Sequence, residues 1–290
     1  MKKFSSILIV LLLMLASFTA GLEYPRGDVN QDNMVDIDDV TCLISYILNG
    51  TWPDEGPASE TFTVNGVSFT MIPVEGGTFT MGLTEGQVSD GQGNNVTPHE
   101  VTLSSYYIAE TEVTQELWLA VMGTNPADFS DNLQNPVQKV TWGECQTFIS
   151  MLNEKTGKTF RLPTEAEWEF AARGGNMSQG YQYSGSNDLD EVGWYDHNSG
   201  GSPHPVGTKA PNELGLYDMS GNVYEWCQDY YSSTIYNVSP AVNPVETEWS
   251  NWRVMRGGGW VYFASLCQVS SRGMCMPNER FNDIGLRLAL

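Results

Sequence analysis

Oxygen-bearing side chains recur in one short acidic stretch, residues 28–39, at the spacing of a calcium-binding loop. Loop positions 1, 3, 5, 9 and 12 carry carboxylate or amide oxygens, and position 7 can give a backbone carbonyl. Position 6 needs a positive φ, which the Asn33 found there tolerates better than most side chains. An acidic turn before a helix is the alternative, but it does not explain this spacing. The predicted calcium ligands are Asp28, Asn30, Asp32, Met34, Asp36 and Asp39.

A second group of residues that could bind a ligand lies at the end of the chain, in residues 256–290. This segment mixes aromatic, methionine, cysteine and small polar residues, which is unusual for a core strand. Tyr and Phe give large contact area at low entropic cost, and Met adapts to varied surfaces. Packing of these residues inside the domain is the alternative. The candidate ligand-binding residues are Trp260, Tyr262, Phe263, Met274, Met276 and Phe281.

Cysteine and histidine offer little for a conventional metal site. The five cysteines follow no zinc spacing, and their odd number leaves at least one free or paired between chains. The three histidines are not clustered, so we do not expect an iron site built on them. The residues are Cys42, Cys145, Cys227, Cys267 and Cys275, and His99, His197 and His204.

Charge and composition predict an exported protein with two folded parts. Lys2 and Lys3 precede an apolar run within residues 1–20, as in a secretory signal, and that run is short for a membrane span. We therefore expect a secreted or cell-surface protein without an integral membrane segment. The net charge of −21 excludes nucleic acid as an expected partner. A small module at 26–50 and a Pro-, Gly- and acid-rich linker at 51–61 precede a large domain at 62–290.

The sequence of the large domain predicts an α+β fold rich in loops. Residues 68–81 alternate as strands around a Gly-Gly turn. Thr141 and Glu144 form a capping-box pattern before a helix expected at 145–154, and Thr164 and Glu167 form another before a helix through Arg173. Thr114 is expected to cap a helix over residues 115–122.

Several ordered motifs make the large domain resemble the formylglycine-generating-enzyme (sulfatase-modifying-factor) family. They include Arg161-Leu-Pro-Thr-Glu-Ala-Glu-Trp-Glu169, Gly221-Asn-Val-Tyr-Glu-Trp226, Arg256-Gly-Gly258 and Gly285-Leu-Arg287. The resemblance implies a C-type-lectin-like fold with little regular structure. It also implies a structural calcium site at Gly221, Val223 and Glu225, which would be a hard-oxygen site.

The same resemblance implies a criterion for catalysis. Family enzymes hold copper(I) between two cysteines in the segment after Arg-Gly-Gly; here Cys267 stands at the second position and Tyr262 at the first. Copper(I) needs soft thiolates, and a phenol does not replace one. We therefore expect no oxidase activity; copper and a catalytic Cys267 apply only if the chain is an oxidase. A shifted Cys267–Cys275 copper pair, a disulfide between them, and two unpaired residues remain alternatives.

Two further resemblances bear on function. The segment from Arg256-Gly-Gly-Gly-Trp260 to Ile284-Gly-Leu-Arg287 is similar to the variable end of proteins made by diversity-generating retroelements, which implies a ligand-binding surface. Residues 26–50 resemble one half of a type I dockerin, a small helical calcium module; a second repeat is not found, so cohesin binding is in doubt.

The sequence predicts an exported protein that binds a protein or glycan through its C-terminal segment. One alternative is a formylglycine-generating oxidase that converts a cysteine in sulfatases. Another is a dockerin-tethered component of a polysaccharide-degrading surface assembly, with a cohesin-like partner or self-pairing through residues 26–50.

Overall fold

The computed structural model describes residues 57–87, 97–233 and 241–290. The chain divides into two compact units, Met1–Ala58 and Ser59–Leu290. The predicted signal, the calcium loop and the first six residues of the linker lie outside the described residues. The second unit is the one described below. Within the described part, no helix combines the length and apolar character needed to cross a membrane.

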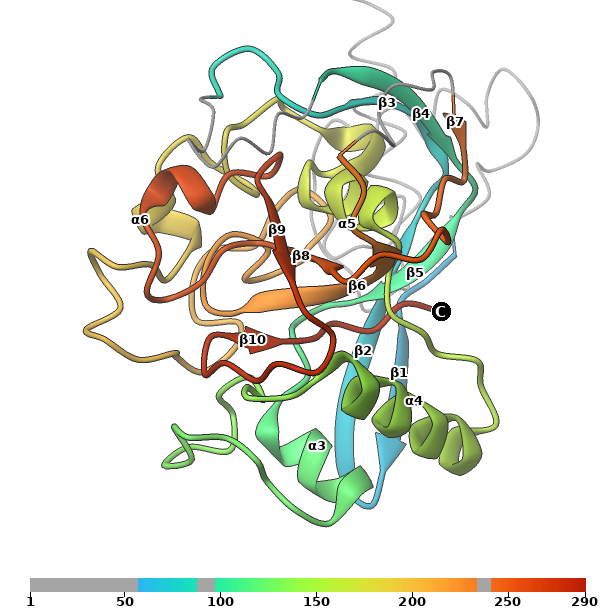
Figure 1. Ribbon diagram of the computed structural model, residues 1–290, viewed down its shortest axis with the longest axis vertical. Helices are drawn as coiled ribbons and strands as arrows, with labels where there is room; N and C mark the ends of the chain where they lie inside the picture. The colour runs from blue at the N-terminus through green and yellow to red at the C-terminus, as the bar shows by residue number, and fades with distance from the viewer. Residues whose placement is uncertain (1–56, 88–96, 234–240) are drawn as a thin grey trace, which may run out of the picture. The chain divides into compact units, whose positions relative to one another are not determined.

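The first sheet of this unit is antiparallel, in the order β1-β2-β5 (Figure 1). Its strands are β1 (Glu60–Val64), β2 (Val67–Val74) and β5 (Tyr106–Ala109). Asn65 and Gly66 join β1 to β2 with φ values of 50° and 87°, as a two-residue hairpin turn requires. The end of the chain lies along β5, because the Ala109 amide donates to Leu288 O at 2.9 Å.

A second sheet has the order β3-β4-β7, with β3 (Gly77–Met81), β4 (His99–Leu103) and β7 (Ala241–Val242). Residues 68–81 thus form two strands around Gly76-Gly77, as predicted. The strands do not pair with each other, because β2 joins the first sheet and β3 joins the second. Gly76 is required at this turn: a Cβ there would lie 2.5 Å from Leu103 O.

The third sheet carries the C-terminal segment, in the order β10-β6-β8-β9. Its strands are β6 (Tyr224–Tyr230), β8 (Arg253–Arg256), β9 (Arg272–Cys275) and β10 (Ile284–Gly285). β9 pairs with β8 and forms one edge of this sheet, at the front of the view in Figure 1. β10 pairs with β6 in parallel.

Short capped helices cover the sheets. They are α3 (Gln115–Met122), α4 (Trp142–Thr156), α5 (Glu165–Ala172) and α6 (Leu189–Val192), with the 3₁₀ turns η1 (Gly175–Met177) and η3 (Ala264–Leu266). Thr114, Thr141 and Thr164 cap their helices as predicted, the last two through complete capping boxes. The predicted start of α4 at Cys145 is wrong by one turn, since helical geometry begins directly after the Thr141 cap.

The core consists of two main hydrophobic clusters. One packs α3 and α4 against the first and third sheets and contains Phe148, Trp226 and Leu286. The other packs α5 against the second and third sheets and contains Trp168 and Phe170. The third sheet contributes residues to both clusters. The C-terminal segment therefore packs against both parts of the core.

Candidate functional site

Three buried arginines hold the C-terminal segment at its start, middle and end: Arg256, Arg272 and Arg287 are each at most 2% exposed. Arg256 pairs with Glu169, and Arg272 contacts Glu165 with Nε to Oε1 at 2.5 Å. Both glutamates lie on one face of α5, four residues apart. Residues between these arginines can be substituted without removing the acidic partners, because those acids lie outside the C-terminal segment.

Arg287 is the third anchor and forms the most complete contacts. Its guanidinium donates to both carboxylate oxygens of Glu225, with Nη2 to Oε1 at 2.8 Å, and to the carbonyls of Ala109 and Tyr217. The indole of Trp168 donates to the same carboxylate at 2.6 Å. Glu225 therefore uses its side chain to join β6, α5 and the end of the chain.

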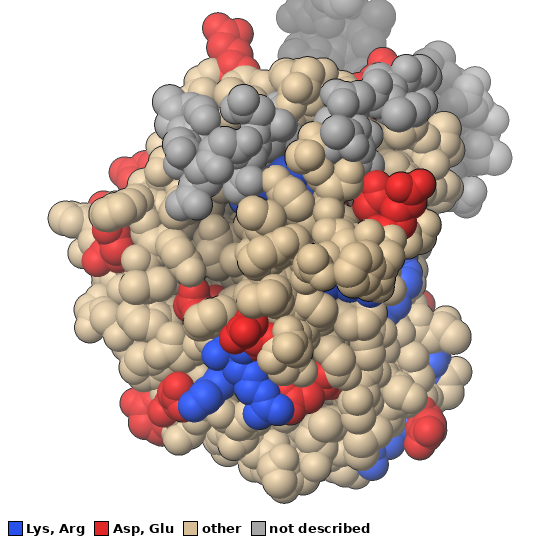
Figure 2. All heavy atoms as spheres, in the orientation of Figure 1, with Lys and Arg blue, Asp and Glu red and all other residues tan. Residues whose placement is uncertain are grey.

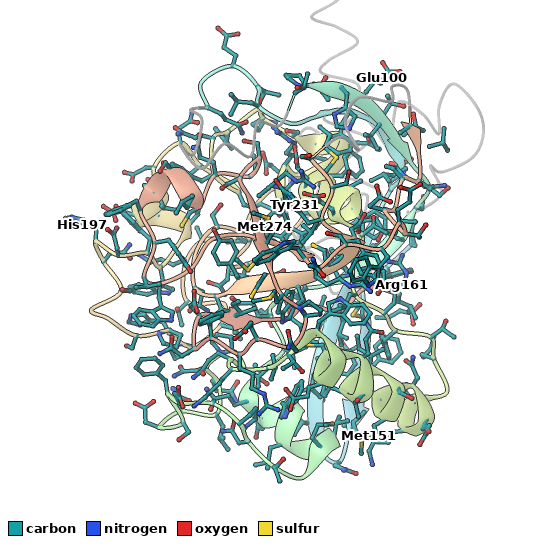
Figure 3. All side chains as sticks on the ribbon, in the orientation of Figure 1. Glu100, Met151, Arg161, His197, Tyr231 and Met274 are labelled. Atoms are coloured by element: carbon teal, nitrogen blue, oxygen red, sulfur yellow. The ribbon has the colours of Figure 1, made fainter. Side chains whose placement is uncertain are left out.

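Between these anchors, apolar side chains point outward. Phe263 is 71% exposed, Phe281 and Val261 are 48% exposed, and Met274 and Met276 are 39% and 38% exposed. Four of the six predicted ligand-binding residues are therefore exposed. We call Phe263, Met274, Met276 and Phe281 the C-terminal face. Figure 3 labels Met274 near the centre of the view, and Figure 2 shows much uncharged surface on the same side of the molecule, with a cluster of charged side chains below the centre.

The other two predicted residues, Trp260 and Tyr262, are half-buried supports. Trp260 packs its ring edge-on against Phe129 with centroids 5.3 Å apart. Tyr262 packs edge-on against Tyr224 and donates its hydroxyl to Asp283 Oδ2 at 2.6 Å. Burial and the neighbouring Asp283 carboxylate raise the pKa of the Tyr262 phenol, so it stays a neutral donor.

The sequence analysis missed the Tyr262–Asp283 hydrogen bond and the exposed Trp252 that lies directly before β8. A tryptophan cluster ahead of Arg256 is a signal that could have identified Trp252. No pattern in the sequence pairs Tyr262 with a residue 21 positions away.

Cys267 and Cys275 are both free and both buried, so the disulfide considered from the sequence is not formed. Cys267 packs with Tyr183 and Leu189, whereas Cys275 packs in the cluster of Trp226. Burial raises the pKa of the Cys267 thiol to about 12 and that of Cys275 to about 11. Neither sulfur is a thiolate near neutral pH.

The Gly221–Glu225 turn lies beside a buried acidic group. Glu112 accepts from the Val223 amide at 3.1 Å and from Asn222 Nδ2 at 2.8 Å. Burial raises the pKa of Glu112, and the nearby Asp218 and Glu225 carboxylates raise it further while Arg287 lowers it. Burial also raises the pKa of Asp218 to about 6. Three carboxylates thus act around one guanidinium.

One oxygen of this group lacks a partner. Asp218 is 2% exposed, its Oδ2 accepts from the Gly207 amide, and its Oδ1 has no hydrogen-bond donor among the described residues. A hard cation would neutralise such an oxygen. Among the described residues, however, no group of three or more His, Cys, Asp or Glu side chains is arranged to hold a metal ion. The Glu225 oxygens, by contrast, are already occupied by Arg287 and Trp168.

Comparison with known proteins places this geometry in a family. The chain is 34% identical to chaperone protein LppX of Paenibacillus barcinonensis over 77% of this chain and 89% of that protein. It is 29% identical to the formylglycine-generating enzyme of Streptomyces coelicolor, covering 81% of this chain and 92% of the enzyme. Treponema denticola variable protein 1 has a similar structure, with a TM-score of 0.73 and 34% identity, over 80% of this chain and 99% of that one. The sulfatase-modifying factor enzyme 1-like domain matches residues 58–290, and the chain therefore belongs to that family.

Proposed function

We propose that this protein is an exported ligand-binding protein that recognises a protein or glycan through the C-terminal face. The observation that carries the proposal is the exposure of Phe263, Phe281, Met274 and Met276 between buried ion-paired arginines. These four large apolar side chains are exposed within one stretch, residues 263–281, and leaving them in water is unfavourable unless a partner covers them. A rigid scaffold lowers the entropic cost of presenting them.

The relatives support recognition in two ways. Treponema denticola variable protein 1 shares the fold over 99% of its own chain, and its name agrees with the resemblance of the C-terminal segment to variable proteins. The Paenibacillus relative is named a chaperone, and binding of a client protein also uses exposed apolar side chains. Both relatives favour a protein ligand for the C-terminal face.

The alternative function is a formylglycine-generating oxidase, which the Streptomyces relative is named for. Copper(I) would have to be held by soft sulfur ligands. Tyr262 donates its hydroxyl to Asp283 at the first position, and the Cys267 thiol at the second has its pKa raised to about 12 by burial. The hard oxygen of Tyr262 leaves Cys267 as the single sulfur at these two positions, which fits copper(I) poorly because that ion prefers a pair of thiolates.

The binding proposal is tested with display libraries on the full chain. A phage library of random peptides and an array of glycans are screened with the wild type, with the double variant Phe263→Ser/Phe281→Ser, and with Trp249→Ser as a control. Trp249 is 75% exposed and lies outside the C-terminal segment, so the control removes an equally large surface side chain. Ligands bound by the wild type and control but lost by the double variant support the proposal; ligands bound equally by all three refute it.

Copper(I) titration against a calibrated chelator separates the two functions. We expect no one-to-one binding by the reduced wild type. Tight binding that is lost in Cys267→Ser, together with oxidation of a substrate cysteine, would establish an oxidase with an altered metal site.

The remaining proposals concern the chain's first part and calcium. We propose that residues 26–50 bind Ca²⁺ through the loop predicted above and tether the protein. If the protein is the dockerin-tethered component considered above, the partner is a polysaccharide-degrading surface assembly. We also propose, from the family resemblance, a second Ca²⁺ at Gly221, Val223 and Glu225. Asp218 Oδ1 lacks a donor three residues before Gly221, but Arg287 and Trp168 already bind the Glu225 carboxylate, so a cation there would have to displace them. Calcium titration of Asp32→Ala and Asp218→Asn separates the two sites.

A further inference from the structure

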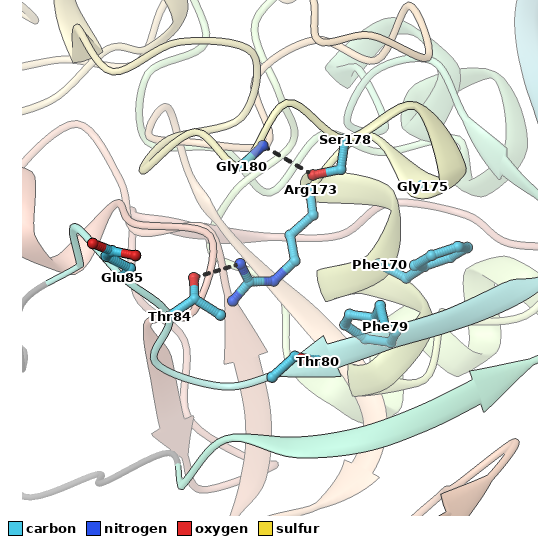
Figure 4. A pocket seen from close by; sticks show the side chains of 9 residues that line it. All are labelled: Phe79, Thr80, Thr84, Glu85, Phe170, Arg173, Gly175, Ser178 and Gly180. Carbon is cyan, nitrogen blue, oxygen red and sulfur yellow. Dashed lines mark hydrogen bonds between the residues drawn. The ribbon is translucent and has the colours of Figure 1, made fainter.

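An open cavity of about 500 Å³ is lined by residues outside the C-terminal segment (Figure 4). It is bounded by β3, by the turn that follows β3, by the end of α5 and by the turns after η1. The residues that matter below are Phe79, Thr80, Thr84, Glu85, Arg173 and Ser178. All of them precede residue 256, so the cavity is distinct from the C-terminal face. Its volume is within the range of small-molecule sites.

One wall of the cavity is an aromatic platform. The Phe79 ring is half-buried and lies 5.0 Å, centroid to centroid, from the Phe170 ring. Phe170 is only 1% exposed and belongs to the core cluster around α5. Because Phe170 fixes Phe79 from behind, the outer part of the Phe79 ring presents a rigid apolar surface to a ligand.

The opposite wall supplies positioned polar groups. Arg173 donates from Nη1 to Thr84 Oγ1 at 3.1 Å and pairs with Glu169 at 2.7 Å. The Thr84 oxygen accepts that bond, so its own hydroxyl hydrogen is directed elsewhere and can donate to a ligand. Ser178 Oγ likewise accepts from the Gly180 amide at 3.3 Å and keeps its hydrogen to donate. Thr80 and Glu85 are exposed at the rim.

The charges select the class of ligand. Arg173 shares Glu169 with Arg256, but its Nε, Nη1 and Nη2 atoms already donate to Glu169, Thr84 and the Gly82 carbonyl. Because these bonds occupy Arg173 and Glu85 adds a negative charge at the rim, an anion is disfavoured. A cation would meet a single exposed carboxylate. A neutral ring with one apolar face and several hydroxyls matches both walls: C–H groups pack on Phe79, hydroxyls donate to Glu85, and hydroxyls accept from Thr84 and Ser178.

We propose that this cavity is a second binding site, for a neutral saccharide unit. It is independent of the proposed recognition by the C-terminal face. A chain with both sites could bind a glycan through one surface and a protein through the other.

Saturation-transfer NMR on the full chain tests the proposal, with the methyl glycosides of glucose, galactose, mannose and N-acetylglucosamine as probes. At least one probe is expected to bind saturably. Glu85→Gln replaces a charge-assisted hydrogen bond by a weaker neutral one, and the affinity is expected to fall about tenfold. Glu75→Gln is the matched control: Glu75 is also exposed, lies just before β3 whereas Glu85 follows it, and does not line the cavity.

A second matched pair uses one strand. Thr80→Ala removes a hydroxyl that lines the cavity. Thr78→Ala removes a hydroxyl on the same face of β3, one that is hydrogen-bonded to Thr102 of β4 instead. Both positions are exposed, so both variants should fold. Weaker binding in Thr80→Ala with unchanged binding in Thr78→Ala supports the proposal.

Three results overturn it. The first is that none of the four glycosides binds the wild type. The second is that Glu85→Gln and Thr80→Ala bind as tightly as their controls. The third is that Phe281→Ser abolishes binding while Glu85→Gln does not, because the saccharide would then be bound by the C-terminal face and the function proposed above would still stand.

Discussion

Replacing Arg287 with Met removes the anchor at the end of the C-terminal segment. The guanidinium is fully buried, and donates to Glu225 and to the carbonyls of Ala109 and Tyr217 at 2.7–3.1 Å. Methionine fills part of the volume but cannot donate. The Glu225 carboxylate keeps one donor, the Trp168 indole, and is left as an uncompensated buried charge.

The expected loss follows from these contacts. Breaking one side of a buried ion pair destabilises a protein by about 3–5 kcal/mol. The two carbonyls left without a donor place Arg287→Met at the upper end of that range, because each unsatisfied buried group costs about 1–3 kcal/mol. Total stabilities of about 5–15 kcal/mol leave the variant close to unfolding.

The loss should also depend on pH. Arg287 lowers the pKa of Glu112, which burial and the neighbouring carboxylates raise. Without the guanidinium, Glu112 becomes harder to ionise. The folded variant therefore binds more protons than the unfolded chain over a wider range of pH. Stability of the variant therefore falls more steeply as the pH rises, and the loss is larger at pH 8 than at pH 5.

Urea unfolding followed by tryptophan fluorescence measures the effect, with Arg280→Met as the control. Arg280 pairs with Glu144 at 2.6 Å, but the two side chains are 51% and 33% exposed. The control should cost under about 1 kcal/mol, as exposed pairs do. Equal losses for the two variants, or a smaller loss at pH 8 than at pH 5, would refute the reasoning about Arg287.

Three further outcomes are expected. Burial raises the pKa of Asp218 from 3.8 to about 6, so in calcium-free buffer the wild type loses stability as the pH rises between these values; Asp218→Asn, measured by urea unfolding, should give a flatter profile. Bound Ca²⁺ would favour the ionised carboxylate and reverse the sign of this slope, and an unchanged slope in saturating calcium would argue against the second calcium site. Thr164→Ala removes the cap of α5 and should lower the free energy of unfolding by about 1 kcal/mol, whereas Thr164→Ser should restore most of it. Gly285→Ala places a Cβ 2.4 Å from Val137 O, so its melting temperature should drop, and an unchanged value would contradict the close approach of β10 to that carbonyl.

Features set by neighbouring residues could be predicted from the sequence. The capping boxes at Thr141 and Thr164 depend on side chains three residues apart, and both form. The strands in residues 68–81 depend on alternation, and both form as well. The family fold could be predicted because its motifs preserve such local patterns in order.

Features set by distant residues could not be predicted. β10 is two residues long and pairs with β6, some 60 positions earlier, in a register that its length does not specify. Tyr262 is half-buried and donates its hydroxyl to Asp283. Residue type alone does not predict whether a tyrosine is buried or exposed. Methionine and phenylalanine are equally suited to a core, so the exposure of Met274 and Phe263 could be proposed only from the segment's composition.

The arrangement of charges explains how recognition and stability can be separate in this domain. The acids that hold the C-terminal segment are Glu165, Glu169 and Glu225, all outside it, and the exposed side chains of the C-terminal face make none of these contacts. Substitutions at exposed positions away from such contacts usually change stability by less than about 0.5 kcal/mol. Phe263 and Phe281 can therefore change with the ligand while Arg256, Arg272 and Arg287 keep the backbone in place. Such a division is what the proposed recognition by the C-terminal face requires.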